Sequence, residues 1–176
     1  MSVLKPKRKQ SSIEYIRLAN DIFSHSLNLT SRLSARYGRI LQPNIMNSAS
    51  KLLSECIEAD STFPSCLEYA KMRETHLINA IGALNVLDVM MAHTYEILML
   101  NPQGAFTKSM SETEAVERLD KMCEETGKLI NVELAALKAV RRKTHDKFKE
   151  LEHLEQKPEE LEGQMKISEF EYELTI

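Results

Sequence analysis

The chain has 176 residues, of which 43% are hydrophobic, so it suits one domain with a substantial buried core, with or without tails. Five glycines, five prolines and no tryptophan favour long helices over a turn-rich sheet protein. The cysteines, Cys56, Cys66 and Cys123, form no Cys-x-x-Cys motif, which argues against a disulfide framework or a zinc site and favours a reducing cytoplasm.

The net charge of −3 conceals two regions of opposite sign. Residues 150–176 hold nine acidic residues and two lysines, a net charge of −7, whereas residues 1–149 hold 21 basic and 17 acidic residues, a net charge of +4. A mildly basic body with an acidic tail suits a protein that binds a polyanion. It is equally typical of a solvated helical protein.

Residues 1–10 form a basic arm that includes the run Lys5-Pro6-Lys7-Arg8-Lys9. Polar residues follow this run instead of an apolar stretch, so the arm does not resemble a secretory signal. Three roles are open for it: contact with nucleic acid, a nuclear address in a eukaryote, or an aid to solubility.

The next part of the chain contains two segments with apolar residues at helical spacing. The first predicts a helix over residues 11–34, which a serine at its start can cap. The second predicts a helix over residues 43–59 that begins at Pro43, since proline suits the first turn of a helix. The link of residues 35–42 contains Gly38 and is predicted to be a basic turn.

Two further helices are predicted, over residues 65–100 and residues 111–149. Gly82 inside the third helix suggests a place where another helix comes close. Ser111 and Glu114 form a capping box at the start of the fourth. Four amphipathic helices with short links predict an all-α fold, an up-down four-helix bundle over residues 11–149.

The acidic tail, residues 150–176, is predicted to begin as a charged helix that breaks near Pro158 and Gly163. Its last ten residues alternate glutamates with apolar residues, which is the period of a strand that needs an edge to pair with. The sequence leaves open whether this segment docks on another protein or is disordered. The residues expected to bind a partner are Phe170, Tyr172, Leu174 and Ile176.

The sequence gives little support for a membrane span, an enzyme or a metal protein. Residues 77–100 are rich in apolar residues but are interrupted by polar and charged ones, which predicts a buried helix. No hydrolase, zinc-protease or phosphate-loop motif occurs, and a di-iron bundle would need two Glu-x-x-His pairs, of which only Glu150 with His153 is present. We therefore expect no catalytic residue, metal or cofactor.

Two histidines and one aspartate on the third helix have structural explanations. His76 and His93 are expected to be structural histidines near the edge of the core. Asp88 lies among apolar neighbours, where an unpaired buried carboxylate would be costly. It is expected at the rim of the bundle, or in an ion pair, which could lie at a subunit interface.

Basic residues are the more informative set, and in an up-down bundle they spread over the body instead of lining one pocket. Such a spread favours tracking of a phosphate backbone with strong salt dependence and little reading of bases. The residues expected to bind nucleic acid are Arg32, Arg36, Arg39, Lys71, Arg73, Arg141, Arg142 and Lys143.

The chain resembles the accessory variability determinant proteins of diversity-generating retroelements, which are similar to four-helix proteins encoded within bacterial large-subunit rRNA genes. The resemblance covers residues 12–145 and lies in a basic turn, an amphipathic helix ending in Glu58-Ala59-Asp60, a long apolar helix, Ser109-Met-Ser-Glu112 and Glu125-Thr-Gly-Lys-Leu-Ile130. The acidic extension and the modest basicity depart from the family pattern.

This resemblance implies a non-catalytic, cytoplasmic protein that forms a homopentamer of four-helix bundles. It would bind a reverse transcriptase and template RNA or another nucleic acid, and would support cDNA synthesis in mutagenic retrohoming. An alternative, drawn from the residues alone, is a protein-interaction adaptor whose acidic C-terminal segment docks on a partner.

Overall fold

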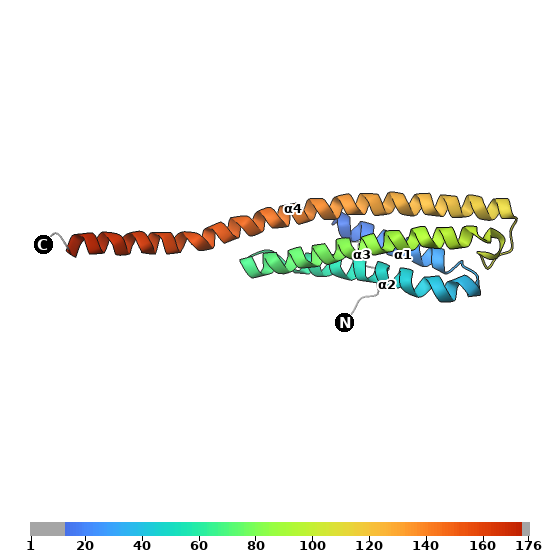
Figure 1. Cartoon of the computed structure of the whole chain (residues 1–176), viewed down its shortest axis with the longest axis horizontal. Helices are drawn as coiled ribbons and strands as arrows, with labels where there is room; N and C mark the ends of the chain where they lie inside the picture. The colour runs from blue at the N-terminus through green and yellow to red at the C-terminus, as the bar shows by residue number, and fades with distance from the viewer. Residues whose placement is uncertain (1–12, 174–176) are drawn as a thin grey trace.

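The computed structural model describes the backbone of residues 13–173 and the side chains of residues 13–155. Figure 1 shows four helices in this part of the chain, with a short 3-10 turn before the last of them. They are α1 (Glu14–Thr30), α2 (Ala35–Ser61), α3 (Leu67–Met99), η2 (Pro102–Gly104) and α4 (Glu112–Glu173). The prediction of an all-helical chain with four helices is confirmed.

The four helices pack side by side around one core. Each packs against its neighbours in the sequence, and α1 also packs against α4, which closes the arrangement (Figure 1). One end, which we call the link end, is where the α1–α2 link meets the α3–α4 link. There the Ser34 amide donates to the Ala105 carbonyl at 2.9 Å, and the Thr107 amide donates to the Arg32 carbonyl at 3.0 Å.

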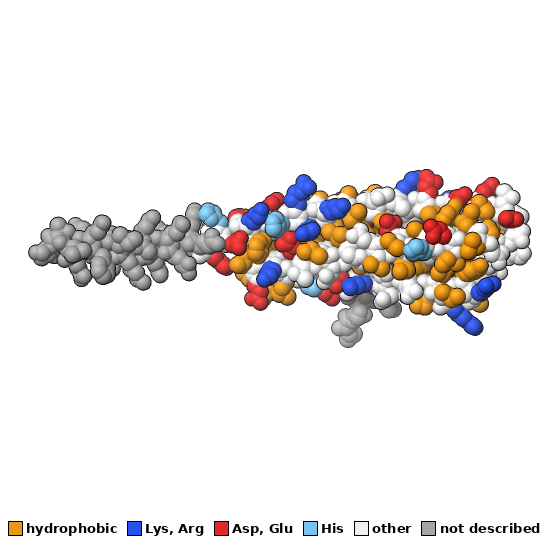
Figure 2. Space-filling model, in the orientation of Figure 1, with side chains coloured by type: hydrophobic (Ala, Val, Ile, Leu, Met, Phe, Trp, Pro, Cys, Tyr) orange, Lys and Arg blue, Asp and Glu red, His pale blue; other side chains and the backbone are white. Residues whose placement is uncertain are grey.

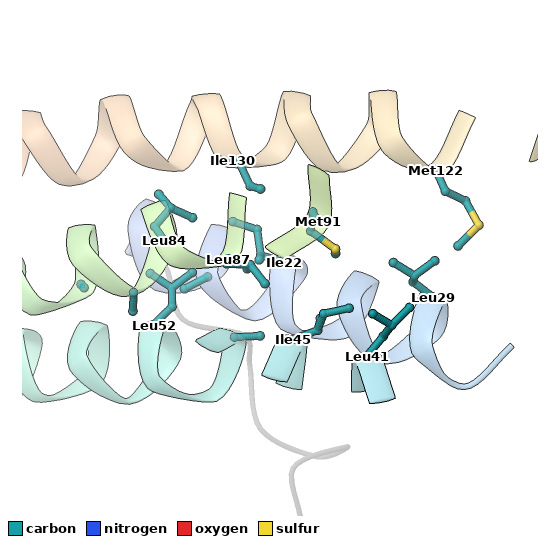
Figure 3. Packing of buried hydrophobic residues seen from close by; sticks show 14 of the residues in the cluster. Ile22, Leu29, Leu41, Ile45, Leu52, Leu84, Leu87, Met91, Met122 and Ile130 are labelled. Carbon is teal, nitrogen blue, oxygen red and sulfur yellow. The ribbon is translucent and has the colours of Figure 1, made fainter. Parts of the chain in front are cut away.

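The core takes apolar side chains from all four helices, as Figure 3 shows. Burial of one such side chain stabilises the fold by about 1.5–3 kcal/mol, so the apolar stripes read from the sequence supply the main driving force. The largest fully buried apolar side chains are Ile22, Ile45, Leu52, Leu77, Leu84, Leu87, Leu98 and Leu137.

The second helix begins earlier than predicted. Residues 35–42, expected as a turn, form the first part of α2, and Pro43 lies inside the helix. Leu41 and Tyr37 are buried one and two turns before Ile45, respectively, so the apolar stripe of α2 continues upstream of the proline. Pro43 is exposed and lacks only one amide donor, and the helix continues through it because the buried side chains on both sides hold it.

The capping box predicted at the start of the fourth helix is confirmed. The Ser111 hydroxyl accepts from the Glu114 amide at 3.3 Å, and a Glu114 carboxylate oxygen accepts from the Ser111 amide at 3.0 Å. These bonds satisfy amides that the first helical turn leaves without partners. They also lower the pKa of the Glu114 carboxyl, the backbone hydrogen bond being the larger cause.

The predicted strand in the acidic tail is wrong for the part that the structure describes. The backbone of α4 stays helical through Pro158 and Gly163 to Glu173, and Figure 1 shows it extending beyond the other helices. Glutamate, leucine, lysine and glutamine dominate this segment, and all four favour helix.

Some predictions fall outside the described part of the chain. Phe170 and Tyr172 lie in the helical backbone of α4, but their side chains are outside the described residues. Leu174, Ile176, the basic arm and the first serines that were expected to cap α1 are outside them altogether; the residue preceding α1 is Ile13.

Replacing a buried and an exposed leucine by alanine tests which leucine side chains stabilise the core by packing. Leu52→Ala is expected to lower the free energy of unfolding by about 2–5 kcal/mol, because Leu52 is fully buried and its removal leaves a cavity. Leu100→Ala makes the same chemical change at a side chain that is 85% exposed, and should shift stability by no more than about 0.5 kcal/mol. Urea unfolding followed by circular dichroism measures both, and equal losses would contradict the assigned core.

Candidate nucleic-acid interface

An open groove of about 500 Å³ lies at the end of the molecule opposite the link end. The start of α1, the α2–α3 link, the first turns of α3 and the middle of α4 form its walls. Three cations and two acids line it: Arg73, Lys143 and Lys147 against Glu14 and Asp60. We call it the basic groove.

The basic groove is lined by both apolar and charged side chains. Ala136, Ala139 and Val140 of α4 line it, and Lys143 and Lys147 follow on the same side of that helix at steps of three and four residues. Phe63 in the α2–α3 link lines the groove and is 73% exposed. The groove therefore offers cations for an anionic group beside apolar and aromatic surface.

A set of polar contacts holds one wall of the groove in place. The Tyr15 hydroxyl donates to Asp60 Oδ1 at 3.5 Å, which ties the start of α1 to the end of α2. Burial raises the pKa of Tyr15 to about 12, against the lowering effect of the Arg73 charge. Arg73 Nη1 donates to the Thr62 carbonyl at 3.3 Å, next to the last turn of α2.

The two lysines of the groove differ in how strongly they are engaged. Lys147 Nζ lies 2.9 Å from Glu150 Oε2, one turn along α4. Lys143 has no acidic side chain within ion-pair distance among residues 13–155. An anion entering the groove would therefore meet Lys143 without having to displace an existing ion pair.

The structure brings together only part of the predicted basic set. Arg73 and Lys143 line the basic groove. Arg141 lies on the α3 side of α4, where its Nε is 3.5 Å from Glu74 Oε1, and Arg142 is exposed close by. Lys71 is exposed near the start of α3 and does not line the groove.

Glu74 holds two basic side chains of α4 beside the groove end. Besides Arg141, the ring of His145 places Nδ1 3.4 Å from a Glu74 carboxylate oxygen. Both basic groups are about half-exposed, so these pairs mainly position side chains. Arg141 is thus already engaged with an acid.

The remaining three predicted residues lie at the link end. Arg32 is in the α1–α2 link, and Arg36 and Arg39 are exposed on the first turns of α2 instead of in a turn. The Arg36 guanidinium lies 5.7 Å from the centre of the Tyr37 ring. The predicted basic residues are therefore divided between the two ends of the molecule, and Figure 2 shows basic side chains scattered over the visible face with acids between them.

Several groove residues were not identified from the sequence. Lys147, Tyr15 and Phe63 line the groove, yet they lie on α4, α1 and the α2–α3 link and are far apart in the sequence. The spacing of Lys143 and Lys147, one helical turn apart on α4, was the available signal. Nothing local in the sequence indicates that Tyr15 and Phe63 meet them.

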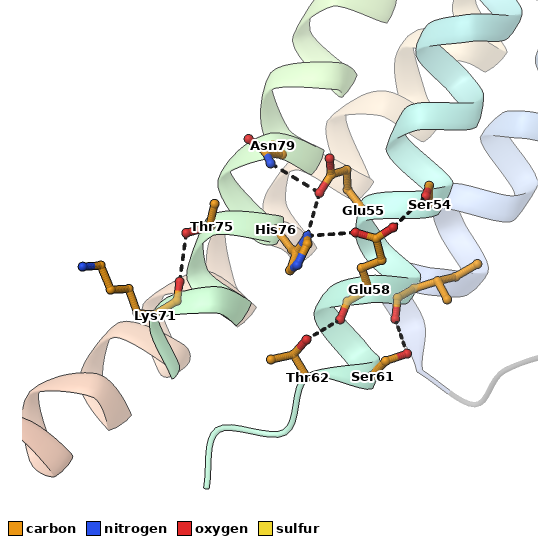
Figure 4. Close-up of polar contacts among 10 residues, drawn as sticks. Ser54, Glu55, Glu58, Ser61, Thr62, Lys71, Thr75, His76 and Asn79 are labelled. Carbon is orange, nitrogen blue, oxygen red and sulfur yellow. Dashed lines mark hydrogen bonds and ion pairs between the residues drawn. The ribbon is translucent and has the colours of Figure 1, made fainter. Parts of the chain in front are cut away.

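A second polar cluster joins α2 to α3, as Figure 4 shows. His76 Nδ1 lies 2.9 Å from Glu55 Oε2 and 3.1 Å from Glu58 Oε2, and the Asn79 amide donates to Glu55 at 3.4 Å. Their ligand-type atoms lie within 4.8 Å of one another, which is a spacing that a metal ion accepts. Since the histidine nitrogen already contacts both carboxylates, polar contacts between the two helices account for the cluster.

The most unusual buried group is Glu133, which the sequence reading did not single out. Glu133 is fully buried on α4, and its Oε1 accepts from the Cys56 thiol of α2 at 3.7 Å. Its Oε2 has no hydrogen-bond partner among the described residues. Burial raises the pKa of Glu133 to about 8, and burial together with the Glu133 charge raises the pKa of the Cys56 thiol. Glu133 therefore stays protonated at neutral pH.

The isolated residues on α3 have ordinary surroundings. His76 is half-buried, as expected near the core edge, whereas His93 is exposed and lies 3.4 Å from Glu96 on the same helix. Asp88 is exposed at the rim on the side of α4. The pKa of Cys123 is raised by burial first, then by the charge of Asp120, and to a smaller extent by the charge of Asp88. An ion pair of Asp88 across a subunit interface stays a prediction.

Comparisons of the chain with protein-family models, with curated proteins and with solved structures gave no match. The case for a function therefore depends on the geometry above and on the resemblance described from the sequence.

The buried acid makes stability depend on pH in a direction opposite to that of a salt-bridged carboxylate. Because the pKa of Glu133 is higher in the folded state, its contribution is fully present below the unfolded pKa and is lost as pH rises towards about 8. Glu133→Gln should remove this dependence. The stability of the variant minus that of the parent should therefore be larger at pH 8–9 than at pH 5.

Urea unfolding of parent and variant at pH 5, 6, 7, 8 and 9 measures the effect. One proton would contribute a slope of about 1.4 kcal/mol per pH unit within the window. Glu117→Gln, at an exposed position of the same helix, is the control and should leave the profile unchanged. Parallel profiles for Glu133→Gln and the parent would contradict the assigned protonation.

Proposed function

We propose that this chain is a non-catalytic, cytoplasmic accessory protein that binds nucleic acid and a reverse transcriptase and works as an oligomer. The convergence of Arg73, Lys143 and Lys147 on an open groove beside the exposed Phe63 is the observation that carries the nucleic-acid part. The resemblance to accessory variability determinant proteins is what supports binding of a reverse transcriptase and template RNA, a role in mutagenic retrohoming, and assembly as a homopentamer. An up-down order of the four helices belongs to the same proposal.

The chemistry of the groove favours a phosphate backbone over a single small anion. The groove is open, its cations come from two helices, and the basic side chains of Arg141 and Arg142 lie on the same part of α4. Contacts of this kind fix a strand by its phosphates and give salt-dependent affinity. The exposed ring of Phe63 adds a surface on which an unpaired base can stack.

Arg32, Arg36 and Arg39 at the link end are a separate basic group in this proposal. They cannot reach the strand that occupies the basic groove, because the two groups are at opposite ends of the helices. In an oligomer they would extend the path of a longer nucleic acid from one subunit to the next.

The salt dependence of binding tests the groove directly. The full chain should bind a structured RNA, measured by fluorescence anisotropy, with an affinity that falls steeply as salt rises. Lys143→Gln with Lys147→Gln should weaken binding and lower the slope of log K against log salt by about 2, one for each lost phosphate contact.

A matched pair of substitutions on the same helix serves as the control. Lys121→Gln with Lys128→Gln removes two exposed lysines of α4 that each lie near a glutamate and do not line the basic groove. This control should leave the slope unchanged. Salt-insensitive or absent RNA binding by the parent chain would remove the nucleic-acid proposal, and equal losses in both double variants would remove the groove from it.

The alternative function is a protein-interaction adaptor whose acidic C-terminal segment docks on a partner. The extension of α4 beyond the other helices favours it, since this segment is helical through Glu173 and is rich in glutamate. Recognition would then use a helix in a groove instead of an added strand.

Truncation separates the two functions. Deleting residues 164–176 should leave RNA binding intact if the basic groove binds nucleic acid. Loss of reverse-transcriptase capture in a pull-down by this truncated chain, when the parent chain shows no RNA binding, would favour the adaptor.

A further inference from the structure

The third helix buries one apolar face in the core and also exposes apolar side chains, such as Ile78 and Val89, on its opposite, mixed face. Leu77, Leu84, Leu87 and Leu98 face the core and are fully buried. By length and composition α3 would also suit a membrane span, yet only 33% of its most apolar window is buried inside the molecule. The sequence predicted a buried helix, so the outer face needs an explanation of its own.

The outer face carries a regular stripe of residues at alternating steps of four and three. All of its members are exposed, and Figure 2 shows hydrophobic side chains gathered where α3 crosses the visible face. We call it the α3 stripe: Lys71, Thr75, Ile78, Gly82, Asn85, Val89, Ala92 and Glu96. This spacing averages 3.5 residues, the repeat of a seam between two helices, and it extends for about 38 Å along the axis.

Gly82 lies near the middle of the α3 stripe, where the described residues leave open space. A Cβ atom added there would meet nothing within 4 Å, so no described part of the molecule needs the glycine for close packing. Glycine inside a helix is unfavourable relative to alanine. The close helix that the sequence predicted at Gly82 is thus not found among the described residues, and a helix of another molecule would supply it.

The charges along the α3 stripe indicate that the molecule packing on it is a second copy of this chain. The stripe carries one positive charge near its start, Lys71, one negative charge near its end, Glu96, and none between them. If a second copy packs antiparallel and centred on the stripe, Lys71 faces Glu96 of the second copy. The same register sets Ile78 against Val89 and Gly82 against Asn85, and two-fold symmetry makes each contact twice.

The surroundings of the α3 stripe agree with such a contact. Met72 and Val86, one residue further round the helix, are 44% and 49% exposed and would widen the apolar surface. Among the described residues the ion-pair distance of Glu96 is to His93 of its own helix, and both are exposed. Asp88 and Glu74 lie on the α4 side, where Glu74 is paired with Arg141. No acid of that side falls on the seam, and the exposed Glu68 lies one turn before Lys71, beyond the last facing pair.

We infer that the α3 stripe is a self-association surface on which a second copy of the chain docks antiparallel. This contact leaves the basic groove open, because the groove takes only Arg73 from α3 and the stripe takes none of the groove residues. It therefore stands independently of the proposed nucleic-acid binding. A two-fold contact makes pairs, unlike the head-to-tail contacts of a five-membered ring.

Sedimentation equilibrium of the full chain over a range of concentrations tests the inference. The parent should show reversible pairing of two copies, separate from any ring of the proposed function, and Val89→Lys should raise the dissociation constant of that pairing about tenfold or more, since it places a charge opposite Ile78, next to the centre of the seam. Val132→Lys is the matched control, because Val132 on α4 is 51% exposed and Val89 is 52% exposed. Circular dichroism confirms that both variants are folded.

Exchanging the two charges tests the antiparallel register and leaves the apolar residues of the α3 stripe unchanged. Lys71→Glu alone and Glu96→Lys alone should each weaken the dimer, and the double variant should restore it, because the two charges face each other across the two-fold axis. A chain that stays monomeric, a dimer that Val132→Lys disrupts as much as Val89→Lys, or a larger assembly that Val89→Lys leaves unchanged would overturn the inference. Flotation with phosphatidylcholine vesicles that Val89→Lys abolishes would assign the α3 stripe to lipid and also overturn it.

Discussion

The fold depends on four apolar helix faces that can be buried only against one another. Each helix supplies fully buried side chains, such as Ile22 of α1 and Leu137 of α4, and no helix could exclude water from its stripe alone. The links at one end add a fixed geometry, since the backbone of Ser34 and Thr107 joins two segments that are more than seventy residues apart. Local helix formation and this long-range closure therefore support each other.

The same closure determines where the chain can carry function. Because α1 packs against α4, Tyr15 and Phe63 are brought beside Lys143 and Lys147, which gives the groove both aromatic and cationic walls. The outer face of α3 is left free by the same arrangement, since its core side points inwards. The molecule thus has two separate surfaces, a groove with three cations and an exposed face of α3, that different partners can occupy.

The helical class of the fold was predictable from the sequence, and the site was predictable only in part. Apolar periodicity located four helices, and the Ser111 capping box located the start of the last one, because these signals are local. Pro43 misled the reading of α2, since burial of Tyr37 and Leu41 outweighs the loss of one hydrogen bond. The glutamates that alternate in the tail suggested a strand, yet strong helix formers prevailed as far as Glu173. Glu133 and Phe63 were missed because their roles come from contacts between distant segments.

Contacts between distant parts of the sequence also constrain how the chain can fold as it is made. The Cys56 thiol meets Glu133 and the α1–α2 link meets Phe106, so neither contact exists until most of the sequence has left the ribosome. The hairpin of α1 and α2 and the start of α3 would emerge with their inner faces still open to water. During synthesis the apolar faces of the first three helices are exposed and can aggregate with other chains. The helix that buries them, α4, is translated last.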